Sequence, residues 1–145
     1  MARFGHPTVR AAGPTDATAV AELLAEFNGE GLPANALARR MAEVQGLETA
    51  FLGEWDGEVA GILVLRIVPT LSGADPWAEI TEMYVRPQFR RNGLGRALVE
   101  AALDCGRQRG CHEFHLLVDR SNVTAQAFYI ALGFQVDSWE MRRDG

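Results

Sequence analysis

Apolar residues recur at helical spacing in two stretches near the start of the chain. After Asp16, a residue type that caps helices, Val20, Leu23 and Phe27 fall on one face of a helix. The polar, glycine-containing stretch "NGEGLP" interrupts this pattern, and Pro33 suits the first position of a second helix. Two consecutive amphipathic helices are therefore expected here.

A strand-like pattern, rich in β-branched and aromatic residues, follows in the middle of the chain. "TAFLGEW" and "EVAGILVLRIV" are separated by Asp56 and Gly57, a pair that favours the tight turn of a β-hairpin. A further strand, "WAEITEMYV", ends before Pro87. This part of the chain is expected to form antiparallel strands.

The second half of the chain alternates between helical and strand patterns. The predicted elements are, in order, a strand at 8–12, a helix from Asp16, a helix from Pro33 to about Val44, two strands within 49–68, a strand at 77–85, a helix at 94–109, a strand at 113–119, a helix at 123–132 and a last strand or two in 134–143. This order predicts an α/β (α+β) fold with a mixed, mostly antiparallel sheet of six to seven strands and about four flanking helices. The length of 145 residues fits one domain, 1–145.

Composition and charge exclude several classes of protein. Hydrophobic residues make up 48% of the chain and charged residues 23%, which is typical of a globular protein. The net charge of −5 argues against a protein that wraps nucleic acid, because such binding needs a broad basic surface. No apolar run approaches a membrane span, and "MARFGHPTVRAAG" lacks the apolar core of a signal peptide. We therefore expect a cytoplasmic protein that binds neither nucleic acid nor membranes.

Cysteine and histidine residues gather around the third predicted helix, but their spacing does not favour a metal site. In the predicted strand "CHEFHLLVD", His112 and His115 would point to opposite faces. Cys105 lies in helical register with Leu98 and is interpreted as a core residue. In a cytoplasmic protein Cys105 and Cys111 are expected to be reduced thiols. No metal is predicted.

The stretch "RRNGLGRA" places basic and glycine residues immediately before a predicted helix. The first N–H groups of a helix lack partners within it and carry partial positive charge, so they attract anions. Gly93 and Gly95 would let an anion approach the backbone, while Arg90, Arg91 and Arg96 add positive charge. The alternative is an ordinary turn whose arginines stay in water, and the residues alone leave both interpretations open.

Two familiar phosphate-binding loops are excluded at this position. A Walker loop requires Lys followed by Ser or Thr after its last glycine, whereas Arg96 and Ala97 follow Gly95 here. The dinucleotide-binding fingerprint requires a small residue where this chain has Leu98. A phosphate bound at this loop would therefore belong to another kind of ligand.

Two segments in the second half of the chain carry patterns of defined spacing. In "VRPQFRRNGLGRALVEAAL", Arg90 is followed after two residues by Gly93 and, after one more, by Gly95. Further on lies "NVTAQAFYIALGF", which contains Tyr129. Together the two segments resemble the signatures of the GNAT superfamily of acetyl-CoA-dependent N-acetyltransferases, the first of which is Arg or Gln, two residues, Gly, one residue, and Gly or Ala. The resemblance covers about residues 76–135, and the first half of the chain fits only in the order of its elements.

The resemblance implies a binding site for acetyl-CoA as the acetyl donor. The pyrophosphate of coenzyme A would lie on the backbone at the helix start, and the pantetheine arm would lie beside a strand end as though it were another strand. The residues that the resemblance assigns to coenzyme A are Met83, Tyr84, Val85, Arg90, Arg91, Asn92, Gly93, Leu94, Gly95, Arg96, Ala97, Asn122 and Phe128.

Acetyl transfer to an amine needs a base, because an alkylamine is mostly protonated at neutral pH. The resemblance points to Glu79 as this base, with Glu82 as the alternative. In a regular strand the two would face opposite sides, so that only one would serve. The resemblance implies Tyr129 as the group that gives the departing thiolate a proton or a hydrogen bond. A backbone N–H near Met83 or Tyr84 would stabilise the oxyanion.

The acceptor implied by the resemblance is a primary amine of a small molecule or peptide, and members of the family often form homodimers. The alternative function is a non-catalytic acyl-CoA-binding sensor or regulatory module, which needs neither Tyr129 nor a nearby carboxylate. Four acidic residues in or near the segments that border the acceptor cleft in the family favour a cationic acceptor. They are Glu22, Glu26, Glu30 and Asp75.

Overall fold

The computed structural model describes residues 5–145, and the chain divides into two compact units after His115. The first unit extends to His115 and the second runs from Leu116 to Gly145. Within the described residues, every helix is too short or too polar to cross a membrane.

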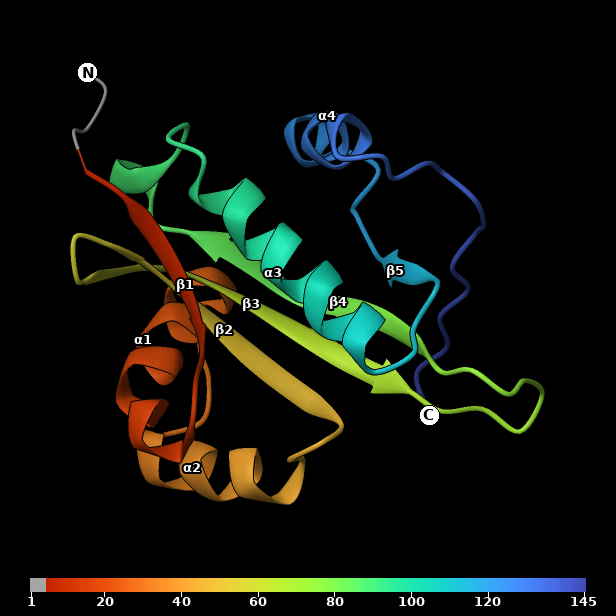
Figure 1. Ribbon diagram of the computed structural model, residues 1–145, viewed down its shortest axis with the longest axis horizontal. Coiled ribbons are helices and arrows are strands. Elements are labelled where there is room, and N and C mark those ends of the chain that lie inside the picture. The colour runs from red at the N-terminus through yellow and green to blue at the C-terminus, as the bar shows by residue number, and fades with distance from the viewer. Residues whose placement is uncertain (1–4) are drawn as a thin grey trace. The chain divides into compact units, whose positions relative to one another are not determined.

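The first unit contains most of the sheet and three α-helices (Figure 1). Its elements are, in chain order, β1 (Pro7–Ala11), a 3-10 turn (Pro14–Asp16), α1 (Ala17–Asn28), α2 (Ala34–Glu43), β2 (Glu48–Trp55), β3 (Glu58–Val68), β4 (Trp77–Val85), a 3-10 turn (Pro87–Phe89), α3 (Leu94–Gln108) and the start of β5 (Phe114–Leu116). These elements follow the order predicted from the sequence.

The sheet is mostly antiparallel. Strands β1 to β4 pair antiparallel in chain order, and β5 follows β4 in a sheet of five strands. Asp56 and Gly57, between β2 and β3, have φ angles of 49° and 82°. Both lie in the left-handed region that a type I′ hairpin turn requires. The predicted fold class is confirmed, although the described residues form five strands and not six to seven.

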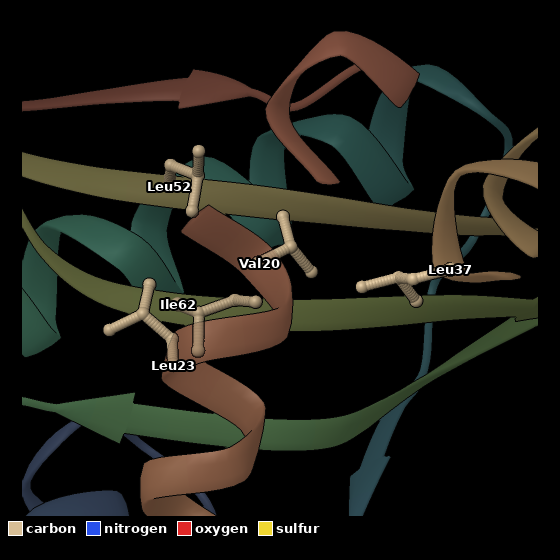
Figure 2. Close-up of a cluster of buried hydrophobic side chains, with 5 residues drawn as sticks. All are labelled: Val20, Leu23, Leu37, Leu52 and Ile62. Carbon is tan, nitrogen blue, oxygen red and sulfur yellow. The ribbon is translucent and has the colours of Figure 1, made fainter. Parts of the chain in front are cut away.

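Helices α1 and α2 cover one face of the sheet. Their buried residues Val20, Leu23 and Leu37 form one cluster with Leu52 of β2 and Ile62 of β3 (Figure 2). Removing this apolar surface from water stabilises the packing of both helices on the strands. The position of α1 over the sheet is therefore fixed by its own apolar stripe.

Helix α3 covers the opposite face, where two glycines let it approach the sheet closely. A Cβ on Gly53 would lie 2.8 Å from Leu94 Cδ1, and one on Gly61 would lie 3.3 Å from Leu98 Cδ1. Figure 2 shows α1 in front of the strands and α3 behind them. The absence of side chains at these glycines makes room for the first turns of α3.

The two cysteines are both free, but their burial differs from the prediction. Cys105 is only half-buried, because the buried stripe of α3 passes through Ala102 and Gly106. Cys111, beyond the helix, is the fully buried one. Burial raises the pKa of the Cys111 thiol. Cys111, and not Cys105, is therefore the core cysteine.

The second unit contains α4 (Val123–Ala131), which agrees with the predicted helix. The predicted last strand is wrong, because residues 134–143 belong to no strand in the structure. A strand needs a neighbouring edge for its backbone hydrogen bonds. Here Val136 and Trp139 are 90% and 77% exposed, so this segment lies in no ladder and covers no core. Strand β5 is also shorter than predicted.

Candidate functional site

A β-bulge interrupts the pairing of β4 with β3. Val64 lies opposite Glu82. The next residue of β3, Leu65, lies opposite Ile80, which leaves Thr81 without an opposite residue. The Thr81 hydroxyl donates to the Val64 carbonyl oxygen at 3.5 Å. One extra residue on a strand shifts the alternation of side chains beyond it.

The bulge places Glu79 and Glu82 on the same face of the sheet. Glu79 lies opposite Arg66, and Glu82 lies opposite Val64. Opposite residues point to the same side of the sheet, as do residues two apart, such as Val64 and Arg66. The prediction that the two glutamates face opposite sides is therefore wrong, because Thr81 adds one residue between them.

This face of β4 is the one that α1 covers. Val64 and Tyr84 pack against the cluster beneath α1 and α2. Tyr84 stacks on Phe27 of α1, with 5.6 Å between ring centroids and 26° between ring planes. Asn28 Nδ2, in the last residue of α1, donates to Glu82 Oε2 at 3.5 Å. Since Phe27 is 46% exposed, an aromatic pair and a carboxylate border solvent at the end of α1.

The surroundings of the two glutamates differ, although both residues are half-buried. Arg66, which is exposed, lies directly opposite Glu79, and opposite charges at such positions attract each other. Glu82 lies opposite the apolar Val64 and beside the neutral amide of Asn28. Glu79 therefore has a cation directly opposite it, whereas the residue opposite Glu82 is apolar and its hydrogen-bond donor is a neutral amide.

The end of β4 presents backbone groups on the side away from β3. The Arg86 N–H donates to the Ala60 carbonyl at 2.8 Å, which fixes the alternation of hydrogen bonds in this antiparallel pair. By that alternation, Tyr84 exchanges hydrogen bonds with β3. The N–H and C=O groups of Met83 and Val85 then point outward.

Contacts of side chains and backbone agree with this orientation. Arg90 Nε donates to the Val85 carbonyl oxygen at 2.8 Å, so that this carbonyl faces away from β3. At the other end of β4, the Ala78 N–H donates to the Glu113 carbonyl at 3.0 Å, directly before β5. Met83 lies further along β4, toward Val85, so this contact does not involve its outward N–H and C=O groups. An extended, amide-rich molecule can add to such an edge as a further strand.

The loop between β4 and α3 has the geometry of an anion-binding turn. Arg91 and Gly93 have φ angles of 63° and 85°, and Gly93 is the N-cap of α3. A Cβ on Gly93 would meet nothing within 4 Å, so its backbone is open to an approaching group. The N–H groups that follow, from Leu94 to Arg96, have no acceptor within the helix. The preceding residue Phe89, only 1% exposed, anchors the loop in the core.

The arginines near this loop make contacts that the sequence did not indicate. Arg96 Nε donates to Glu100 Oε1 at 3.0 Å, along the surface of α3. Arg86 was not predicted as a site residue. Its Nε donates to Glu26 Oε2 and its Nη1 to the Val59 carbonyl, each at 2.9 Å. Arg86 therefore ties the end of β4 to α1, and its sequence signal is only its place between a strand and a proline.

Three of the acidic residues predicted near an acceptor have other partners. Arg86 lies 3.8 Å from Glu22 and 2.9 Å from Glu26, which offsets their negative charge. Asp75 lines a cavity of about 260 Å³ near the start of β4, and its carboxylate lies 3.7 Å from His112 Nε2. These residues give less support for a cationic acceptor than the two glutamates of β4.

The second unit holds Asn122, Phe128 and Tyr129. Asn122 is the N-cap of α4, and its Oδ1 accepts a hydrogen bond from the Ala125 N–H at 3.1 Å. The Tyr129 ring makes edge contacts with Phe128 and Phe134, at centroid distances of 5.1 and 5.6 Å. Burial raises the pKa of Tyr129 to about 12, so its phenol keeps its proton at neutral pH. In residues 5–145, no group of His, Cys, Asp and Glu side chains is arranged to hold a metal ion.

Comparison with known proteins matches this arrangement to one family. Residues 18–134 match the Acetyltransferase (GNAT) family. An aminoglycoside N(6')-acetyltransferase type 1 from Stenotrophomonas maltophilia is 33% identical over 134 residues, which cover 89% of this chain and 86% of that protein. The matched segment includes β4, the glycine loop, α3 and Tyr129.

Solved structures share the fold. An aminoglycoside N-acetyltransferase in complex with CoA has a TM-score of 0.84 at 23% identity, covering 100% of this chain and 98% of its own. A putative acetyltransferase from Agrobacterium tumefaciens has a TM-score of 0.80 at 27% identity, covering 94% of this chain and 99% of its own. The chain therefore belongs to the GNAT family of acetyltransferases and is an acyltransferase enzyme.

Proposed function

We propose that this enzyme transfers the acetyl group of acetyl-CoA to a primary amine of a small molecule, by direct attack of the amine on the thioester. One observation carries the proposal: residues 79–97 present, in sequence, two carboxylates on one face of β4, an outward-facing strand edge at Met83 and Val85, and a left-handed glycine turn at the start of α3. These features suit the amine, the pantetheine arm and the pyrophosphate respectively.

The donor binds along the edge of β4 and at the start of α3. The pyrophosphate accepts hydrogen bonds from the N–H groups that follow Gly93, where the helix dipole favours negative charge. Arg91 and Arg96 add positive charge near it. The pantetheine arm pairs with the outward carbonyl of Met83 and the outward N–H of Val85 as an added strand. The resemblance also assigns Asn122 to the donor; its Nδ2 would serve, since its Oδ1 caps α4.

The amine loses a proton before it attacks, and Glu79 or Glu82 accepts that proton. Both carboxylates are available, because the bulge at Thr81 brings them to one face. Attack forms the new C–N bond and leaves a tetrahedral intermediate with an oxyanion and a cationic nitrogen. This nitrogen gives its extra proton to the other glutamate or to solvent before the C–S bond breaks. The outward N–H of Met83 stabilises that oxyanion, whereas the N–H of Tyr84 is turned toward β3.

Collapse of the tetrahedral intermediate breaks the C–S bond and releases the thiolate of coenzyme A. The protonated phenol of Tyr129 donates a hydrogen bond to this thiolate. Because the pKa of Tyr129 is raised to about 12, complete proton transfer to a thiolate with a pKa of about 8.5 would be unfavourable. Tyr129 therefore acts as a hydrogen-bond donor to the leaving group.

The acceptor is a small molecule that carries several cationic amines. Two carboxylates on one face of β4 attract such a molecule, and an aromatic pair, Phe27 and Tyr84, offers a surface for its rings at the end of α1. The relative from Stenotrophomonas maltophilia is described as an aminoglycoside acetyltransferase. Aminoglycosides are therefore the first acceptor class to test.

The test is an assay of free thiol release from acetyl-CoA with aminoglycosides, polyamines, amino acids and short peptides as acceptors. Amine-dependent thiol release, with an acetylated amine detected by mass spectrometry, is the expected result. The matched control is the double variant Glu79→Gln/Glu82→Gln, which keeps the shape of both side chains and removes their basicity. Binding of acetyl-CoA without transfer to any amine would contradict the proposal and favour a non-catalytic sensor.

A further inference from the structure

The side chain of Arg90 follows the edge of β4 and is directed back along the strand. Its Nε donates to the Val85 carbonyl oxygen at 2.8 Å. Its guanidinium carbon lies 5.8 Å from the centroid of the Tyr84 ring, which itself stacks on Phe27. Arg90 thus contacts the last two residues of β4, although it belongs to the loop before α3.

The Val85 carbonyl is the last outward acceptor of the strand edge. A molecule that adds to this edge as a strand pairs with the N–H and C=O groups that point outward, those of Met83 and Val85. Because Arg90 already donates to the Val85 carbonyl, the added molecule meets there an acceptor that is engaged on one side and has the arginine side chain beside it. Its next acceptor along the edge is the carbonyl of Met83. The contact therefore defines where the pairing of an added molecule begins.

We propose that Arg90 is a positioning residue for the pantetheine arm, and that it acts through its Nε hydrogen bond to Val85 and not through its charge on the pyrophosphate. The inference rests on the proposed function, since it assumes that acetyl-CoA binds at this edge. Through the same side chain, Arg90 holds the Tyr84 ring at the junction between the donor edge and the face of β4 that bears Glu82.

Two substitutions separate the hydrogen bond from the charge. Glutamine carries an N–H donor at the ε position without a positive charge, so Arg90→Gln can keep the contact with Val85. Methionine has a similar length but no donor, so Arg90→Met loses both. The control is Arg91→Gln, which removes the charge of the neighbouring loop residue.

The experiment measures the dissociation constants of acetyl-CoA and of S-acetylpantetheine, which carries no phosphate, for the wild type and the three variants. Arg90→Met is expected to weaken both ligands roughly tenfold, because the end of β4 and the Tyr84 ring are no longer held in place and have to be ordered on binding. Arg90→Gln is expected to bind both ligands nearly as the wild type does. Arg91→Gln is expected to weaken acetyl-CoA only.

Four results would overturn the inference. If Arg90→Gln and Arg90→Met both weaken acetyl-CoA but not S-acetylpantetheine, Arg90 acts through charge. If Arg90→Met binds both ligands as the wild type does, Arg90 positions nothing. Should Arg90→Met fail to fold, weakening of acetyl-CoA alone by Arg90→Gln would still show that Arg90 acts through charge. A wild type that binds neither ligand would instead overturn the proposed function and the inference with it.

Discussion

Gly53 of β2 lies directly beneath Leu94, the first residue of α3, so that a Cβ on the glycine would stand 2.8 Å from Leu94 Cδ1. Real Cβ atoms do not approach other atoms this closely, and Leu94 is itself 1% exposed and has little room to move. The glycine therefore sets how closely the start of α3 lies on the sheet. That helix start carries the N–H groups proposed to bind the pyrophosphate.

Replacing Gly53 with alanine is expected to displace Leu94 and destabilise the protein by about 1–3 kcal/mol, the usual cost of overpacking a core. For a chain of this size, the melting temperature falls by roughly 3 °C per kcal/mol. The affinity for acetyl-CoA should fall as well, because the helix start moves. Thermal denaturation with and without acetyl-CoA measures both effects. The matched control is Gly13→Ala, where a Cβ meets nothing within 4 Å. Equal melting temperatures for the two variants would contradict the close contact.

Acetyl-CoA is expected to raise the melting temperature, because its proposed site exists only in the folded chain. At a hundredfold excess over the dissociation constant, the ligand adds about 2.7 kcal/mol to the free energy of unfolding. Gly95→Glu should abolish this shift, since it places an anion where the pyrophosphate would lie. Thermal scans over a range of acetyl-CoA concentrations provide the measurement. A variant that is shifted as much as the wild type would place the pyrophosphate elsewhere.

The shared face of Glu79 and Glu82 predicts that neither carboxylate is wholly indispensable. Replacing the base with glutamine should lower turnover most near neutral pH and less as the pH approaches about 10, where the amine is already neutral. We expect single variants Glu79→Gln and Glu82→Gln to lose activity unequally, and the double variant to lose the most. The profile of kcat/KM against pH for all three measures this. If one single variant matches the double variant at every pH, the other glutamate takes no part in proton removal.

Tyr129→Phe keeps the ring and its contacts with Phe128 and Phe134 but removes the hydroxyl. A thiolate leaves without strict need for an acid, so turnover should fall by roughly 10- to 100-fold, the effect of one lost hydrogen bond to a charged group. The affinity for acetyl-CoA should hardly change. Turnover and acetyl-CoA binding, measured on one sample, check the two expectations together. Unchanged turnover, with the chemical step shown to be rate-limiting, would remove Tyr129 from the mechanism.

The same variant tests the burial of the Tyr129 hydroxyl through alkaline stability. The folded state raises the pKa of Tyr129 from 10.0 to about 12, so the unfolded chain loses this proton first as the pH rises. The free energy of unfolding therefore falls between pH 10 and 12, by about 2–3 kcal/mol from this group, and is unaffected by it below pH 10. Denaturant unfolding at a series of pH values should show this loss in the wild type and not in Tyr129→Phe. Parallel curves would show that the hydroxyl is solvated.

The order of the elements and the position of the glycine loop could be predicted from the amino-acid sequence. Local backbone preferences explain the hairpin turn at Asp56 and Gly57 and the left-handed Gly93 before α3. Such preferences depend on the residue types at and next to the turn, which the sequence gives directly. Helical periodicity likewise located α1, with Val20 and Leu23 on its buried face. Local rules of this kind need no knowledge of which strand lies beside which.

Only the tertiary structure shows which side chains share a face of the sheet and which charged groups have partners. The bulge at Thr81 is a property of the pairing between β3 and β4, and no residue type in β4 predicts it. It nevertheless brings Glu79 and Glu82 to one side of the sheet. The contacts of Arg86 and Arg90 likewise cannot be predicted from the sequence. One contacts α1 and the other the end of β4, because long side chains take the acceptors that the fold brings within reach. The predicted last strand failed for the same reason, since a strand pattern becomes a strand only where the fold supplies an edge to pair with.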